Sequence, residues 1–195
     1  MDDKGTPVRS FERKASCQGL EIYQEEDNTP EKIGVRAGEK CKEQLKAQSI
    51  KSGKYRSVVG PMLSGVLAHE SFGHLSECDF VITGSSPLTK QIGNRLGTKY
   101  ATIIDEGTPA HPGAFYLPYD DQGIQTTKTV LLKDGILKGY LHNRGTAEEM
   151  GVLPTGNSRA IHFMYPPIPR MKNTYFAPGE LTKEEILEQL GTGIY

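Results

Sequence analysis

The sequence of 195 residues predicts an α+β fold in which a largely antiparallel sheet packs against a helix. Its 22 glycines and 12 prolines favour many turns and short strands over a helical bundle. Residues 127–142 read as two strands joined by Asp134-Gly135, a dipeptide that suits the positive φ angles of a type I′ hairpin turn. Residues 60–77 read as a helix that begins at Pro61.

Three elements are expected before this helix. Residues 19–23 resemble a short strand, and residues 36–49 are rich in helix formers, with Cys41 and Leu45 one turn apart. Residues 54–60 are β-branched enough for a second strand. The first 36 residues are polar and charged, so they cannot form a core alone.

Beyond the helix, the chain reads mainly as β. Residues 99–105 predict a strand, 154–159 a loop, and 161–176 an extended edge interrupted by prolines. Two further helical segments carry terminal signals. Thr146 and Glu149 could cap one helical turn. A second helix is expected to begin at a capping box of Thr182 and Glu185, flanked by a hydrophobic staple of Leu181 and Ile186. Gly191 can end this helix.

Composition argues against several classes of partner. The 23 basic and 24 acidic residues give a net charge of −1, which disfavours binding to nucleic acid or to an anionic membrane. No stretch approaches the roughly 20 apolar residues that span a bilayer. Because the N-terminus lacks the features of a secretory signal, we expect a cytoplasmic protein. The cysteines, Cys17, Cys41 and Cys78, are odd in number and irregularly spaced, as reduced thiols are.

A His-Glu-x-x-x-His motif interrupts the apolar stripe of the helix at residues 60–77. Leu63, Val66 and Leu67 are followed at helical spacing by Glu70 and His74, where further apolar residues would be expected. In the related His-Glu-x-x-His pattern, two histidines bind zinc and the glutamate acts as a general base. The motif therefore nominates His69 and His74 as metal ligands and Glu70 as the catalytic residue.

The extra residue between the histidines would point their side chains in different directions on a regular helix. On a regular helix, positions five apart diverge by about 140°. A π-type turn would bring His69 and His74 over one another, and Gly73 would ease the distortion. We therefore predict a π-bulge or a broken turn between residues 68 and 75. Two histidines and a glutamate this close also arise by chance, so the spacing alone leaves metal binding and an ordinary helix face both open.

Other candidate sites are weaker. Cys78 follows His74 by one turn and is more simply a small packing residue. His111, His142 and His162 read as loop or strand histidines, so none of them is named as a third ligand. Residues 120–123 read as a turn, because they lack the ligand series of a calcium loop. Residues 154–159 lack the glycine pattern of a phosphate-binding loop, and the cysteine spacing offers no closed structural zinc site.

Several blocks in a fixed order resemble the TldD/PmbA family of metallopeptidases, on its TldD-like, catalytic side. These blocks are GVLAHESFGHLSECDFV, GTKYATIIDEGT, YDDQG, TVLLKDGILKGYLHNR, PTGNSRA and PPIPRMKNTYFAPG. The resemblance implies a Zn²⁺-dependent peptidase that hydrolyses unfolded or small peptides, with Glu70 as general base on zinc-bound water. It also implies a homodimer, or a heterodimer with a TldE- or PmbA-like subunit.

The resemblance further implies a chain truncated at both ends. Residues 1–50 would be a remnant of an upstream N-terminal domain with its linker, and 51–195 a partial TldD-like catalytic domain. The family's third zinc ligand, a cysteine, is expected beyond residue 195. The alternative function is therefore a non-catalytic fragment or partner subunit that assembles with a full-length homologue.

Overall fold

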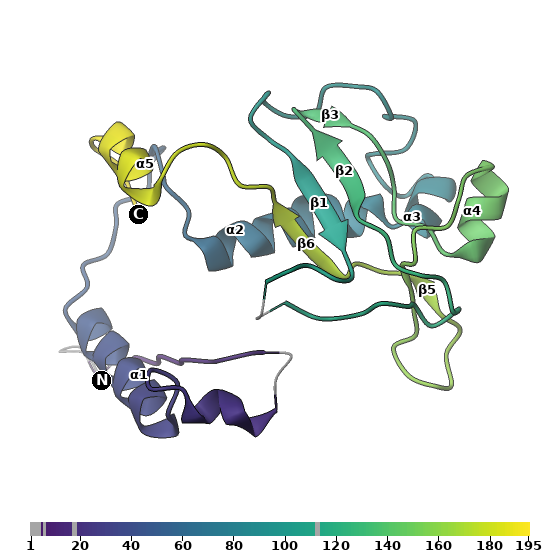
Figure 1. Cartoon of the computed structure of the whole chain (residues 1–195). Helices are drawn as coiled ribbons and strands as arrows, with labels where there is room; N and C mark the ends of the chain where they lie inside the picture. Colours follow the sequence, from purple (N-terminus) through teal and green to yellow (C-terminus); the bar gives the residue numbers. More distant parts are fainter. Residues whose placement is uncertain (1–4, 6, 17–18, 112–113) are drawn as a thin grey trace. The chain divides into compact units, whose positions relative to one another are not determined.

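The computed structural model describes residues 5, 7–16, 19–111 and 114–195. These residues form two compact units (Figure 1). One unit is built within residues 1–54 and 110–114, and the other within 55–109 and 115–195. Every strand of the described chain lies in the second unit, which also carries the His-Glu-x-x-x-His motif.

The second unit contains a four-stranded sheet with the order β3-β2-β1-β6. Its strands are β1 (Ile103–Glu106), β2 (Thr129–Lys133), β3 (Ile136–Leu137) and β6 (Asn173–Phe176), and each neighbouring pair is antiparallel. A separate antiparallel pair is formed by β4 (Ser158–Arg159) and β5 (Ile168–Pro169). The predicted α+β class with a largely antiparallel sheet is confirmed.

The β2–β3 hairpin turns at the predicted dipeptide. Asp134 has a φ of 50° and Gly135 a φ of 78°, while Lys133 pairs with Ile136 on either side of them. These positive angles match the two-residue turn expected from the sequence. Gly135 is further constrained because a Cβ there would lie 2.2 Å from the carbonyl oxygen of Gly97.

The predicted helix begins at Pro61 and crosses one face of the sheet (Figure 1). It consists of α2 (Pro61–Ala68), a π turn η2 (His69–Gly73) and a 3₁₀ turn η3 (His74–Ser76), followed by α3 (Cys78–Ile82). Both α2 and η2 contact β6. The core between helix and sheet is apolar, and its fully buried members include Ala68, Ile103, Leu131, Leu132 and Leu137.

The capping signals near the C-terminus are largely confirmed. The helix α5 (Lys183–Leu190) begins with a reciprocal Thr182–Glu185 capping box and ends at Gly191, whose φ is 61°. In α4 (Arg144–Met150) the N-cap is Asn143 rather than Thr146. The Asn143 side chain accepts from the backbone N–H of Thr146 at 2.9 Å, and Thr146 Oγ1 accepts from the Asn143 N–H at 3.2 Å.

Two strands expected in the N-terminal part are absent, and one expected helix is present with different bounds. Residues 19–23 belong to a 3₁₀ helix, η1 (Leu20–Gln24), because the Glu21 carboxylate accepts from the Gly19 N–H and closes a local turn. Residues 54–60 form no strand, since their pairing is confined to one bridge between Ser57 and Ile194. The helix predicted for 36–49 is α1 (Pro30–Leu45), which begins earlier because Thr29 caps it.

Among the described residues, no helix combines the length and apolar composition that crossing a bilayer requires.

Candidate metal centre

A single π-helical turn brings the two histidines of the motif together. The backbone N–H of His74 donates to the carbonyl oxygen of His69, five residues earlier, and the flanking turns are α-helical and 3₁₀. A π turn widens the helix by one residue, so side chains five positions apart share a face. The predicted π-bulge between residues 68 and 75 is confirmed.

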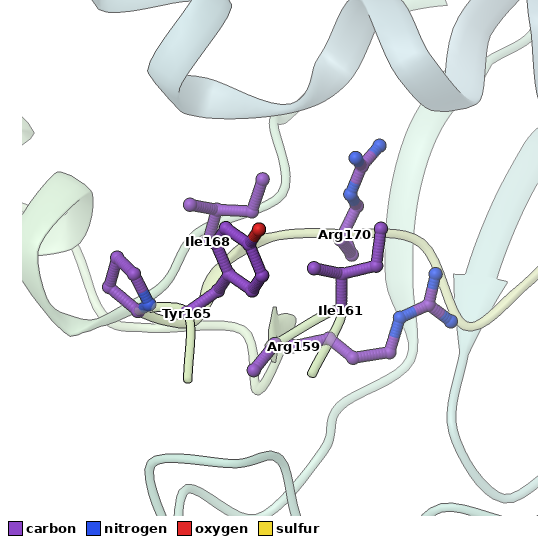
Figure 2. A pocket seen from close by; sticks show the side chains of 7 residues that line it. Arg159, Ile161, Tyr165, Ile168 and Arg170 are labelled. Carbon is purple, nitrogen blue, oxygen red and sulfur yellow. The ribbon is translucent and has the colours of Figure 1, made fainter. Parts of the chain in front are cut away.

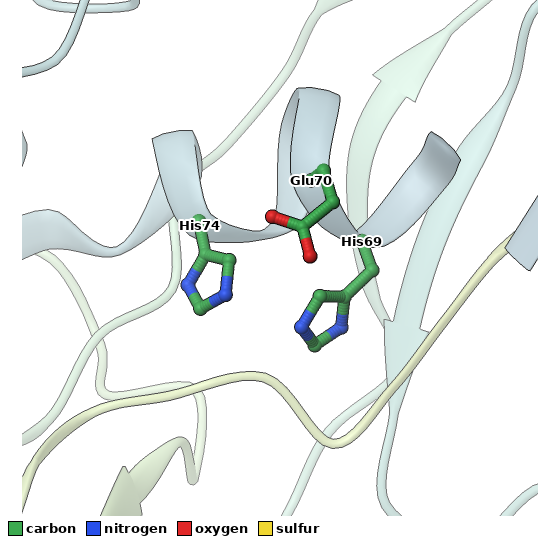
Figure 3. Close-up of side chains that lie close together, drawn as sticks. All are labelled: His69, Glu70 and His74. Atoms are coloured by element: carbon green, nitrogen blue, oxygen red, sulfur yellow. The ribbon is translucent and has the colours of Figure 1, made fainter. Parts of the chain in front are cut away.

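The three side chains of the motif converge on one point (Figure 3). The ring centroids of His69 and His74 are 4.7 Å apart, with the ring planes at 83°. One potential ligand atom from each of His69, Glu70 and His74 lies within 4.8 Å of the others. In the part of the chain that the structure describes, no other group of three such side chains meets this criterion.

Gly73 is explained by packing rather than by the shape of the turn. Its backbone angles, φ −56° and ψ −65°, are helical and open to any residue, so the expectation that it eases the distortion is wrong. A Cβ at this position would instead lie 2.0 Å from Sδ of Met171, which is 3% exposed. The glycine therefore allows the segment before β6 to approach the π turn closely.

The environment of His69 favours its neutral form. Burial lowers the pKa of this imidazole, and the charges of His74 and Arg159 lower it further. Glu70 and Asp105 act on the same pKa in the opposite direction. A neutral imidazole is the form that coordinates a metal ion, so the lowered pKa suits a ligand.

A buried carboxylate that the sequence reasoning missed holds the second histidine. Glu77 has no exposed side-chain surface, and its Oε1 lies 3.3 Å from Nδ1 of His74 and 3.3 Å from Nη1 of Arg170. Burial raises the pKa of Glu77, while Arg170 and His74 lower it. With Nδ1 engaged, Nε2 of His74 is the ring nitrogen left for a metal ion.

A second buried acid anchors the strands beside the motif. Asp105 in β1 is completely buried, and its Oδ1 accepts from the Lys172 N–H and the Thr174 hydroxyl, each at 2.8 Å. Its Oδ2 accepts from the Asn157 amide at 2.8 Å and lies 3.3 Å from the Lys172 ammonium. Burial lowers the pKa of Lys172, and Asp105 opposes that shift.

Two features of the sequence could have marked Glu77 and Asp105 as residues of the site. Glu77 stands three residues after His74, the spacing at which neighbouring helical turns place side chains on one face. Asp105 follows the buried Ile103 and Ile104 in a strand, where a charge needs a compensating partner. Neither signal identifies that partner, because Arg170 and Lys172 lie far along the chain.

The alternative ligands do not join the motif. Cys78 is fully buried with Sγ 3.3 Å from Sδ of Met150, and burial raises the pKa of its thiol to about 11. Nδ1 of His142 faces the Thr146 hydroxyl at 3.4 Å. Asp120 closes a turn by accepting from the N–H groups of Gln122 and Ile124, each at 2.9 Å, as residues 120–123 predicted.

Residues 52–195 match the family model of the PmbA/TldA metallopeptidase C-terminal domain. A Methanothermobacter thermautotrophicus protein named Metalloprotease is 38% identical over 177 residues, which cover 91% of this chain and 38% of that protein. The Zinc metalloprotease TldD homolog of Saccharolobus solfataricus is 35% identical over 152 residues, which cover 78% of this chain and 34% of that protein.

Solved structures share the fold. A Thermotoga maritima crystal structure superposes with a TM-score of 0.72 and 33% identity, covering 87% of this chain and 38% of that one. TldE from Thermococcus kodakarensis superposes with a TM-score of 0.59 and 22% identity, covering 80% and 35%, and this likeness shows the fold alone. The chain thus spans little more than a third of the proteins it resembles. With most of its length matched by the family model, the chain belongs to the TldD/PmbA family of metallopeptidases.

Proposed function

We propose that this chain forms the metal-binding part of a zinc metallopeptidase that hydrolyses peptide bonds in small or unfolded peptides. His69 and His74 would hold the zinc ion, and Glu70 would act as the general base. The observation that carries the proposal is the π turn, which places both imidazoles and the glutamate around one point. The S. solfataricus relative is named as a zinc metalloprotease, which supports zinc as the metal.

The donor set fits zinc. Imidazole nitrogen is a preferred zinc ligand, and the Glu77 contact at Nδ1 of His74 is the kind of outer hydrogen bond that orients such ligands. Catalytic zinc sites usually take three protein ligands and leave one position open. The third ligand would come from outside these 195 residues, as the cysteine implied by the family resemblance does.

The chain's own residues would divide the chemistry between them. When bound, zinc would supply Lewis acidity toward the scissile carbonyl and the attacking water. Glu70 is exposed beside both imidazoles, where it can accept a proton from water and return it to the leaving amine. Glu77 would keep the His74 ring in place throughout, because its carboxylate is fixed between His74 and Arg170.

The alternative function is a non-catalytic fragment or partner subunit that assembles with a full-length homologue. The family resemblance supports assembly as a homodimer or with a TldE-like subunit. The two functions differ in whether the 195-residue protein binds zinc and cleaves peptides.

One experiment separates them. Zinc content is measured by elemental analysis, and cleavage of an internally quenched peptide is followed by fluorescence, for the parent and for Glu70→Gln, His69→Ala and His74→Ala. We expect zinc to be lost in both histidine variants, and only activity to be lost in Glu70→Gln. Glu149→Gln, an exposed glutamate on α4, is the control. Zinc retained by both histidine variants would contradict the proposal, whereas an inactive, zinc-free parent would favour the alternative.

A further inference from the structure

A cavity of about 630 Å³ lies at the β4–β5 hairpin (Figure 2). Its wall combines apolar side chains, including Ile161, Tyr165 and Ile168, with the two arginines Arg159 and Arg170. The apolar members are exposed, since Ile161 retains 84% of its surface and Tyr165 59%. No acidic residue is among those that line the cavity.

Strand pairing places the arginines on the same side of the hairpin. Ser158 pairs with Pro169, and both are buried, whereas the next pair, Arg159 and Ile168, is exposed. Successive side chains along a strand alternate between faces. The N–H of Arg170 donates to the carbonyl oxygen of Asn157 at 2.7 Å, which continues the pairing and turns Arg170 to the Arg159 face.

The two guanidinium groups differ in how far their charge is compensated. Arg170 lies 3.3 Å from the buried Glu77 carboxylate, so its charge is already paired. Within the described part of the chain, the Arg159 guanidinium makes no hydrogen bond or ion pair. The acid bonded to the cavity wall, Asp121, accepts from the backbone N–H of Ala160 at 2.7 Å. The Arg159 guanidinium is therefore an unpaired positive group beside an apolar wall.

The cavity adjoins the metal centre through a shared carboxylate. Oε1 of Glu77 is 3.3 Å from Nη1 of Arg170, which lines the cavity, and 3.3 Å from Nδ1 of His74. The charge of Arg159 also lowers the pKa of the His69 imidazole, so the cavity wall lies near this histidine as well. Guanidinium groups bind carboxylates through two parallel hydrogen bonds, which makes an unpaired arginine a specific receptor for that group.

From this arrangement we infer that the cavity is a substrate subsite that binds a peptide carboxylate at Arg159 and a neighbouring apolar side chain against Ile161, Tyr165 and Ile168. The inference rests on the proposed peptidase function and adds a substrate class to it. The carboxylate can be the free C-terminus of a short peptide or an acidic side chain. Either source offers the same two oxygens to the guanidinium.

Peptide binding tests the subsite without catalysis. Fluorescence anisotropy is recorded for three N-terminally labelled peptides on the Glu70→Gln protein, with and without added zinc. The peptides are Ala-Ala-Leu-Ala with a free carboxylate, its C-terminal amide, and the amide of Ala-Ala-Leu-Glu. We expect at least one carboxylate peptide to bind roughly tenfold or more tightly than the plain amide, as one charged hydrogen-bonded pair allows. The peptide that gains affinity identifies the source of the carboxylate.

Arginine variants test whether the tighter binding of carboxylate peptides depends on Arg159. In Arg159→Gln, the advantage of the carboxylate should disappear while binding of the plain amide changes less than twofold. Arg144→Gln removes the same charge from an exposed arginine outside the cavity and should change nothing. Equal binding of all three peptides, equal loss for all in Arg159→Gln, or no binding would overturn the subsite. Carboxylate selectivity in a protein without zinc or peptidase activity would instead refute the proposed function and leave the subsite standing.

Discussion

Nδ1 of His74 lies 3.3 Å from a carboxylate oxygen of Glu77 that solvent does not reach. We expect Glu77→Gln to weaken zinc binding about 10- to 100-fold, because losing the outer partner of a metal-bound histidine has effects of this size. Competition with a chromogenic chelator measures the affinity. The exposed Glu149→Gln is the control, and urea unfolding shows that the variant is folded. Unchanged affinity in a folded Glu77→Gln protein would show that Glu77 does not position His74.

The contact between Gly73 and Met171 predicts a steric effect. Gly73→Ala would place a Cβ 2.0 Å from the Met171 sulfur, so we expect it to lower the free energy of unfolding by about 1–3 kcal/mol. Gly65→Ala is the matched control, since its Cβ would meet nothing within 4 Å and alanine favours the helix by up to about 1 kcal/mol. Urea titrations measure both variants. Equal stability of the two would contradict the close approach.

Removing the cation of the buried pair Asp105–Lys172 should lower the free energy of unfolding far more than removing the cation at Glu106. Lys172→Met leaves the Asp105 carboxylate without its cation, which should cost about 3–5 kcal/mol of unfolding free energy. Adding Asp105→Asn should restore part of that loss, because the uncompensated charge is then gone. Lys128→Met removes an exposed ammonium that lies 3.9 Å from Glu106, and should cost at most about 1 kcal/mol. Additive losses in the double variant would argue against coupling.

Cys78 predicts how stability depends on alkaline pH. Burial raises the pKa of its thiol from about 9 to about 11, so the folded state retains the proton longer than the unfolded chain does. The stabilisation is complete below about pH 9 and is lost as the pH rises toward 11, a change on the order of 2–3 kcal/mol. Unfolding free energies of the parent and Cys78→Ala, measured from pH 8 to 11, should converge by this amount. Parallel curves would contradict it.

Elements encoded by neighbouring residues could be predicted from the sequence. The Asp134-Gly135 hairpin and the Thr182–Glu185 capping box each depend on groups within four residues of one another. The strands expected at 19–23 and 54–60 failed because a strand needs a distant partner, which composition does not reveal.

The same division between local and distant contacts applies to the site. The π turn could be predicted from the spacing of His69 and His74 together with the premise that both bind one metal ion, and the turn is local because one backbone hydrogen bond closes it. The partner of Glu77 is Arg170, 93 residues away, and only the fold brings the two together. The requirement for glycine at position 73 could not be predicted from the sequence either, because it comes from the close approach of the Met171 side chain.

Four of the five residues in the run from Arg170 to Thr174 contact a buried residue elsewhere in the fold. Arg170 reaches Glu77, Met171 fills the space at Gly73, and Lys172 and Thr174 both bind Asp105. One inserted residue would shift everything after it by about 3.3 Å and turn each side chain to the opposite face. The length of this run should therefore be fixed in evolution, with insertions and deletions confined to the loops around it.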